Sequence, residues 1–221
     1  MALEKRAPAR EFSTIELLGN PIGFFKVLIP DARWIELYLV TVFLAVVGGI
    51  MFVPAKQHIL ASQNAASAAI AFQPLLVPLL LVFSVTLGII ASFTLIMITS
   101  VFLGKHVKVA EAWAVANAIS VVKLGFSTLT VGFVVAFVGA DHFAVQSDLS
   151  QVLPSLEKLL PSDSPKIQSL YAVIDVFNIY SVALFTMALK YWMKVATIRA
   201  FIFAAILGVG PQLLLRCFAN G

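Results

Sequence analysis

Residues 112–140 read AWAVANAISVVKLGFSTLTVGFVVAFVGA, an apolar run that contains a single charged side chain, Lys123. A helix needs about 20 such residues to cross the ~30 Å hydrocarbon core of a bilayer. Small side chains recur along the run at every seventh position, at Ala118, Gly125, Gly132 and Gly139. Small residues on one face let two helices approach closely in lipid. The run therefore predicts a transmembrane helix whose packing seam is formed by these four residues.

The composition of the whole chain agrees with this prediction. Of the 221 residues, 61% are hydrophobic and only 12% are charged, and the mean hydropathy is +1.00. Soluble domains carry roughly 25% charged residues, so the composition excludes a soluble globular protein. The net charge of +4 is modest, and the basic residues flank apolar runs. This pattern indicates membrane topology rather than nucleic-acid binding.

Four further apolar runs predict four further spans. They cover about residues 35–53, 74–103, 170–189 and 195–215. The first is expected to stop at Pro54, and the second begins near Pro74 or Pro78. The predicted fold is an all-α, polytopic membrane bundle of five transmembrane helices. We expect residues 1–34 to form a cytoplasmic or interfacial segment and residues 35–221 to form the transmembrane domain.

Shorter amphipathic stretches lie outside these runs. Residues 12–18 and 22–29 are each too short to span, and we expect them to lie in the headgroup layer. The acidic connection 141–166 has apolar residues at helical spacing, which predicts one or two short amphipathic helices on the outer face, broken at Pro154 and Pro161. The first ten residues are polar, so no cleaved signal peptide is expected.

The distribution of lysine and arginine predicts the orientation. With the N-terminus inside, the cytoplasmic segments hold ten of them and the opposite segments hold four, with Lys123 counted in neither set. The cytoplasmic set is Lys5, Arg6, Arg10, Lys26, Arg33, Lys105, Lys108, Lys190, Lys194 and Arg199, and the opposite set is Lys56, Lys158, Lys166 and Arg216. Because basic residues concentrate on the cytoplasmic side, we predict the N-terminus inside and the C-terminus outside.

A candidate intramembrane polar site comes from the charged residues inside the predicted spans. A charged side chain near the centre of a span costs at least ~2.5 kcal/mol and marks a functional site by default. Lys123 and Asp175 qualify, with Asn117 and Asn178 as polar neighbours. One interpretation is an ion or proton path between the third and fourth helices. The interpretation that we favour is structural, either as a buried pair or as side chains that snorkel toward the interface.

No pattern in the sequence indicates a cofactor, a metal or an enzyme. The single cysteine, Cys217, excludes an internal disulfide and a cysteine-based metal site. His58, His106 and His142 fall at predicted membrane edges, far apart in sequence. No grouping of acid, base and nucleophile is present in the pattern. We therefore expect a protein that is not an enzyme and binds no cofactor.

Several motifs carry a family resemblance. Four stretches resemble the turns and helix starts of the Yip-domain family. They are LGK at 103–105, EAWAVA at 111–116, IDVFNIYS at 174–181 and KVATIRA at 194–200. The N-terminal residues Asn20, Pro21, Phe24, Phe25 and Lys26 also fit. The resemblance covers nearly the whole chain and implies five spans. The short N-terminus looks like the prokaryotic branch, which implies the bacterial cytoplasmic (inner) membrane and no inherited Rab-GTPase partner.

Three functions follow as hypotheses. The first is a non-enzymatic, Yip-like membrane protein that acts as a scaffold, assembly partner or membrane-organising component. The second is a small transporter or channel component that uses Asp175, Lys123 and the asparagines. The third is an accessory subunit of a larger membrane complex. The expected partners are the lipid bilayer and either other membrane proteins or a second copy of the chain, and not nucleic acid.

Overall fold

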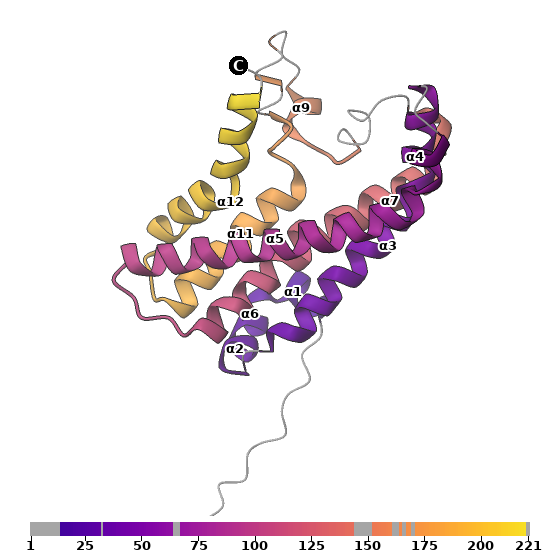
Figure 1. Ribbon diagram of the computed structural model, residues 1–221. Helices are drawn as coiled ribbons and strands as arrows, with labels where there is room; N and C mark the ends of the chain where they lie inside the picture. The colour runs from indigo at the N-terminus through magenta and orange to yellow at the C-terminus, as the bar shows by residue number, and fades with distance from the viewer. Residues whose placement is uncertain are drawn as a thin grey trace, which may run out of the picture.

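The computed structural model describes residues 14–31, 33–63, 67–143, 152–160, 164, 167–168 and 171–219. Within these residues the regular structure is helical and no β-strand is present. The helices are α1 (Thr14–Gly19), α2 (Pro21–Asp31), α3 (Trp34–Ser62), α4 (Ser67–Ala71), α5 (Gln73–Phe102), α6 (Val109–Ser120), η1 (Val121–Phe126), α7 (Ser127–Val138), η2 (Ala140–His142), α9 (Leu156–Leu159), α11 (Val176–Trp192) and α12 (Thr197–Ala219). The all-helical fold class is confirmed (Figure 1).

Three helices are long and apolar enough to cross a membrane, which is the character of an integral membrane protein. They are α3, α5 and the continuous helix Val109–Val138, which combines α6, η1 and α7. The remaining two predicted spans correspond to α11, with 17 residues, and α12, with 23 residues. These two pack against each other, and the count of five spans stays a prediction.

The first and fourth helices differ from their predicted bounds. Helix α3 continues through Pro54 to Ser62 instead of stopping, because Ala55 and Ile59 are buried in a small cluster with Val135 at the end of α7. The apolar contact extends the helix beyond its proline. Helix α11 begins at Val176 rather than near residue 170. The cause is Asp175, whose extended backbone and side-chain cap fix the helix start.

The N-terminal stretches form helices, as expected, but their apolar face is buried against protein rather than in the headgroup layer. Leu17, Phe24, Phe25 and Leu28 are fully buried and belong to the main core. Helix α2 lies against α6 and α11 (Figure 1). The carbonyl of Leu17 has no intrahelical donor, because residue 21 is a proline without an N–H. The Tyr180 hydroxyl of α11 donates to this carbonyl at 3.1 Å or to that of Leu18 at 2.8 Å.

All three tryptophans lie at one end of the bundle. Trp113 of α6 stacks on Phe93 with ring centroids 4.4 Å apart and lies 6.0 Å from the ring of Trp34. The indole N–H of Trp192, at the end of α11, donates to Glu111 of α6 at 3.0 Å. Arg33, Lys105, Lys108, Lys190 and Lys194 flank the helix ends and turns on this side. Tryptophans and basic residues at one level are typical of a cytoplasmic membrane interface, and we call this part the basic end.

Helices α3 and α7 cross with their backbones in close contact. A Cβ atom built on Gly132 would lie 2.3 Å from the carbonyl oxygen of Gly48, and one built on Gly48 would lie 2.4 Å from the carbonyl oxygen of Thr128. The two backbones therefore touch directly. Gly125 lies seven residues before Gly132, in η1, and a Cβ built on it would lie 3.2 Å from the side chain of Leu44 in α3. We call this region the α3–α7 crossing.

The other two members of the predicted seam have different positions. Ala118 is fully buried in α6, within the main core. Gly139 follows α7 and has a φ of +99°, a conformation that glycine adopts without strain and other residues rarely adopt. Its role is to end the helix, and a Cβ there would meet only the neighbouring Asp141 and His142. Three of the four residues spaced by seven are therefore packing positions, and the fourth, Gly139, ends the helix.

The outer connection 141–166 is described only in part. Helix α9 is a single turn that begins two residues after Pro154. Ser155 forms an isolated antiparallel bridge with Asp175, and the N–H of Val176 donates to the carbonyl of Pro154 at 3.3 Å. The connection is thereby attached to the start of α11. The expected helix break at Pro161 lies outside the described residues.

Candidate intramembrane polar site

Lys123 is built into an unusual turn of the third helix. It belongs to η1, a π-helical segment of six residues, and such wide turns often mark functional positions. Its ammonium group crosses to α12 and donates to the carbonyl oxygen of Gly208 at 2.7 Å. The side chain is thus held between two helices by a charge-assisted hydrogen bond, the stronger kind of such bonds.

The position of this bond in α12 has a sequence cause. Residue 211 is a proline, so the carbonyl of Leu207 lacks its usual intrahelical donor, and a proline also bends a helix. Figure 1 shows that α12 changes direction along its length. Gly208 is the next residue after Leu207, and a Cβ built on it would lie 3.1 Å from the side chain of Val182 in α11. Lys123 therefore brings a positive charge to the carbonyls at the bend.

Asp175 is the N-cap of α11 rather than a residue within the helix. Its Oδ1 accepts hydrogen bonds from the backbone N–H groups of Phe177 and Asn178, both at 2.8 Å. A carboxylate at a helix N-terminus is stabilised by these N–H groups and by the helix dipole. The charge is satisfied locally, which removes much of the cost of placing it near the membrane.

Asn178 connects Asp175 to α12. Its amide nitrogen donates to Oδ2 of Asp175 at 2.7 Å and to the carbonyl of Val173 at 2.9 Å, and it lies 3.3 Å from the side-chain oxygen of Gln212. Its own side-chain oxygen is buried and has no partner among the described residues. Gln212 lies one helical turn beyond Gly208. Lys123 and Asn178 therefore bind neighbouring turns of α12.

Asn117 is separate from this group. It is fully buried in α6, and its amide nitrogen donates to the carbonyl of Trp113, one turn earlier, at 2.8 Å. Its side-chain oxygen has no partner in the described part of the chain. The structure therefore brings Lys123 and Asn178 to α12, and Asp175 is linked to it through Asn178, whereas the hydrogen bond of Asn117 stays within its own helix.

Lys123 and Asp175 do not form a direct ion pair within the described residues. Lys123 instead lines a cavity of about 330 Å³ between α5, η1, α11 and α12, with Gln212, Ser92 and Ser181 as the other polar side chains. The hydroxyls of Ser92 and Ser181 already donate to carbonyls of their own helices. Asp175 is not part of this cavity lining.

Gln212 is the member of the site that sequence reasoning missed. It follows Pro211 in an apolar run, and an amide next to a helix-bending proline is the only local signal that could have indicated it. Glu111 was also not predicted. Its carboxylate accepts a hydrogen bond from the indole of Trp192 and lies 3.6 Å from the ammonium group of Lys108. Its partner is distant in sequence, and no spacing rule relates the two.

The arrangement can hold charges and helix ends in place, and it can accommodate a small polar molecule beside Lys123. Among the described residues, no group of three histidine, cysteine, aspartate or glutamate side chains could hold a metal ion. Comparison of the chain with protein-family models, curated proteins and solved structures gives no match.

Proposed function

We propose that the protein is a non-enzymatic, multi-pass membrane protein that acts as a scaffold or assembly partner. In this proposal α11 and α12 are the fourth and fifth spans and the basic end faces the cytoplasm. The observation that carries the proposal is the use of the polar side chains. Asp175 caps α11, Lys123 binds a carbonyl of α12, and Asn178 joins Asp175 to Gln212. These contacts hold helices together, and among the described residues no carboxylate lines the cavity beside Lys123.

The motifs that resemble the Yip-domain family support a structural role. In residues 174–181, Asp175 and Asn178 start the helix, Tyr180 binds the carbonyls of α1, and the Ser181 hydroxyl donates to the carbonyl of Asn178. In residues 103–116, Gly104 takes a positive φ in the turn and Glu111 binds Trp192. Tyr180, Asn178 and Glu111 therefore link one element to another. Asp175 and Ser181 form their hydrogen bonds at the start of α11 itself. We propose membership of the prokaryotic branch on this basis.

A specific observation favours the transporter hypothesis as the second candidate. The cavity of about 330 Å³ contains the ammonium group of Lys123 and the amide of Gln212, and a cationic cavity would attract a small anion. In this alternative Lys123 is the residue that binds the transported species, whereas Asp175 remains a cap. An accessory subunit of a larger complex is a special case of the scaffold proposal.

A pair of experiments distinguishes the two candidates. A photoreactive amino acid is placed at Leu79, Phe83 or Leu87, which are exposed on α5, and at the buried Ile89 as the control. A scaffold should give discrete cross-linked products in native membranes from the exposed positions only. Uptake of small anions is measured in parallel with the protein in proteoliposomes. Absent cross-links together with a flux that Lys123→Met abolishes would overturn the scaffold proposal in favour of transport.

A further inference from the structure

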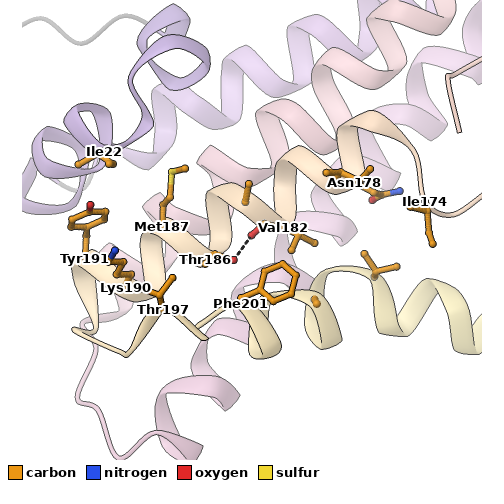
Figure 2. Close-up of a pocket in the computed structure, with 14 residues that line it drawn as sticks. Ile22, Ile174, Asn178, Val182, Thr186, Met187, Lys190, Tyr191, Thr197 and Phe201 are labelled. Carbon is orange, nitrogen blue, oxygen red and sulfur yellow. Dashed lines mark hydrogen bonds between the residues drawn. The ribbon is translucent and has the colours of Figure 1, made fainter. Parts of the chain in front are cut away.

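A long groove runs between α11 and α12 on the surface of the bundle. Its volume is about 750 Å³, more than twice that of the cavity beside Lys123. Figure 2 shows Lys190, Tyr191 and Thr197 at one end, and Ile174 and Asn178 at the other. Thirteen positions along α11 separate Asn178 from Tyr191, which corresponds to about 20 Å at 1.5 Å per residue. The groove is therefore longer than one leaflet of hydrocarbon, which is about 15 Å.

The chemistry of the groove changes along its length. The middle is apolar, with Val182, Ala183, Phe201 and Ala205 facing it. The hydroxyl of Thr186, also in the middle, is already donated to the carbonyl of Val182 at 2.8 Å. At the basic end Lys190 is exposed, and its ammonium group lies 5.5 Å from the centre of the Tyr191 ring. The described lining contains no carboxylate, so the positive charge at this end is not neutralised from within the groove.

The size of the groove favours a slender occupant over a helix. A helix about 10 Å in diameter and about 20 Å long would fill roughly 1,600 Å³, which is well above the available volume. A hydrocarbon chain is much thinner than a helix and can lie in the groove along its whole length. An apolar channel that ends in a cation at the membrane interface is complementary to a lipid with an anionic headgroup.

We propose that the α11–α12 groove is a binding site for one anionic phospholipid, with an acyl chain along Val182, Ala183 and Ala205 and the phosphate beside Lys190. The inference goes beyond the scaffold proposal and rests on it only for the placement of α11 and α12 in the bilayer and of the basic end at the cytoplasmic face. The lipid would fill the space that the two helices leave open and would link the basic end to the charge of the inner leaflet.

The test uses the delipidated full chain in detergent and measures bound lipid by native mass spectrometry. The probes are phosphatidylglycerol and phosphatidylcholine with identical acyl chains. We expect one phosphatidylglycerol to remain bound at concentrations at which phosphatidylcholine is lost. Lys190→Gln should weaken phosphatidylglycerol binding about fivefold, since one lysine near an anionic surface contributes about that factor. It should leave phosphatidylcholine unaffected. Lys105→Gln, which removes an exposed charge outside the groove, is the matched control.

A second variant tests the chain-binding part of the groove. Ala205→Phe should reduce the binding of both lipids because it fills the groove, whereas Ala136→Phe, at an exposed alanine of α7, should not. Equal binding of the two lipids by the unmodified protein, or unchanged preference in Lys190→Gln, would overturn the proposal even if Ala205→Phe failed to fold. Displacement of the lipid by millimolar inorganic phosphate would also overturn it, because a headgroup site alone would then explain the binding. Cross-linking and flux, which test the scaffold proposal, are independent of these outcomes.

Discussion

The α3–α7 crossing and the α11–α12 pair join helices in opposite ways. At the α3–α7 crossing, Gly48 and Gly132 bring two backbones into direct contact, and no side chain lies between them. Along α11 and α12, Gln212 meets Asn178, Lys123 reaches Gly208 from η1, and the groove stays open to the outside. The first contact depends on shape alone. The second combines apolar packing with a few hydrogen bonds and leaves space that another molecule can fill.

This difference shows how a bundle can be rigid on one side and adaptable on the other. Lipid supplies no hydrophobic drive for helix association, so stability must come from close packing or from polar contacts. Close packing is lost when volume is added, whereas a polar contact is lost when a donor or acceptor is removed. The two regions should therefore respond to different classes of substitution.

The largest effect is expected at the α3–α7 crossing. Gly132→Leu places a side chain where even a Cβ would lie 2.3 Å from a backbone oxygen, and the helices must separate. We expect a loss of about 3 kcal/mol or more, measured by thermal unfolding in detergent. Gly210→Leu is the matched control, because the nearest atom to its Cβ is 4.0 Å away. If both leucine variants unfold at the same temperature, the crossing is not a close backbone contact.

The next effect is expected where Lys123 binds α12. Lys123→Met keeps the length of the side chain but removes the donor to Gly208, and we expect a loss of about 2 kcal/mol, as for a charged hydrogen bond. Lys105→Met, at an exposed lysine of the α5–α6 turn, should be neutral. The double variant Lys123→Met with Asp175→Asn should be no more stable than Lys123→Met alone. A gain of more than about 1 kcal/mol in the double variant would reveal a direct charge pair.

Asp175 allows its role as a cap to be separated from its charge. Asp175→Ala removes the acceptor for two backbone N–H groups and should cost about 1 to 2 kcal/mol. Asp175→Asn should cost less, because asparagine keeps the cap and loses only the acceptor for the amide of Asn178. The measurement is again thermal unfolding. Equal destabilisation by both substitutions would mean that the negative charge itself is required.

The smallest effect is expected at the N-terminal helices. Tyr180→Phe removes the hydroxyl that binds the carbonyls of Leu17 and Leu18, at a cost of about 1 kcal/mol. Hydrogen exchange should accelerate in α1 and α2 and remain unchanged at the α3–α7 crossing. Tyr191→Phe is the control, since that ring lies in the groove at the basic end. Faster exchange throughout the bundle would show that α1 and α2 are not a separate unit.

The sequence predicted the helices better than it predicted their partners. The apolar runs gave the three long helices because length and hydropathy are local properties. The spacing of Gly125 and Gly132 indicated a packing face, but only the fold shows that Gly48 lies opposite. Gln212 and Glu111 were not predicted, because their partners are 34 and 81 residues away. Asp175 was expected within a helix, since hydropathy does not distinguish a capping residue from the helix that it starts.

The bond between Tyr180 and the carbonyl of Leu17 joins residues that are 163 positions apart. During synthesis at about 5 to 20 residues per second, the first two helices therefore leave the ribosome on the order of 10 s before their partner. Through that interval Phe24 and Phe25 lack the part of the protein surface that α11 supplies, and the bilayer surface is the nearest other apolar environment. Docking of α1 and α2 onto α11 can therefore occur only after α11 has been synthesised, late in the biogenesis of the chain.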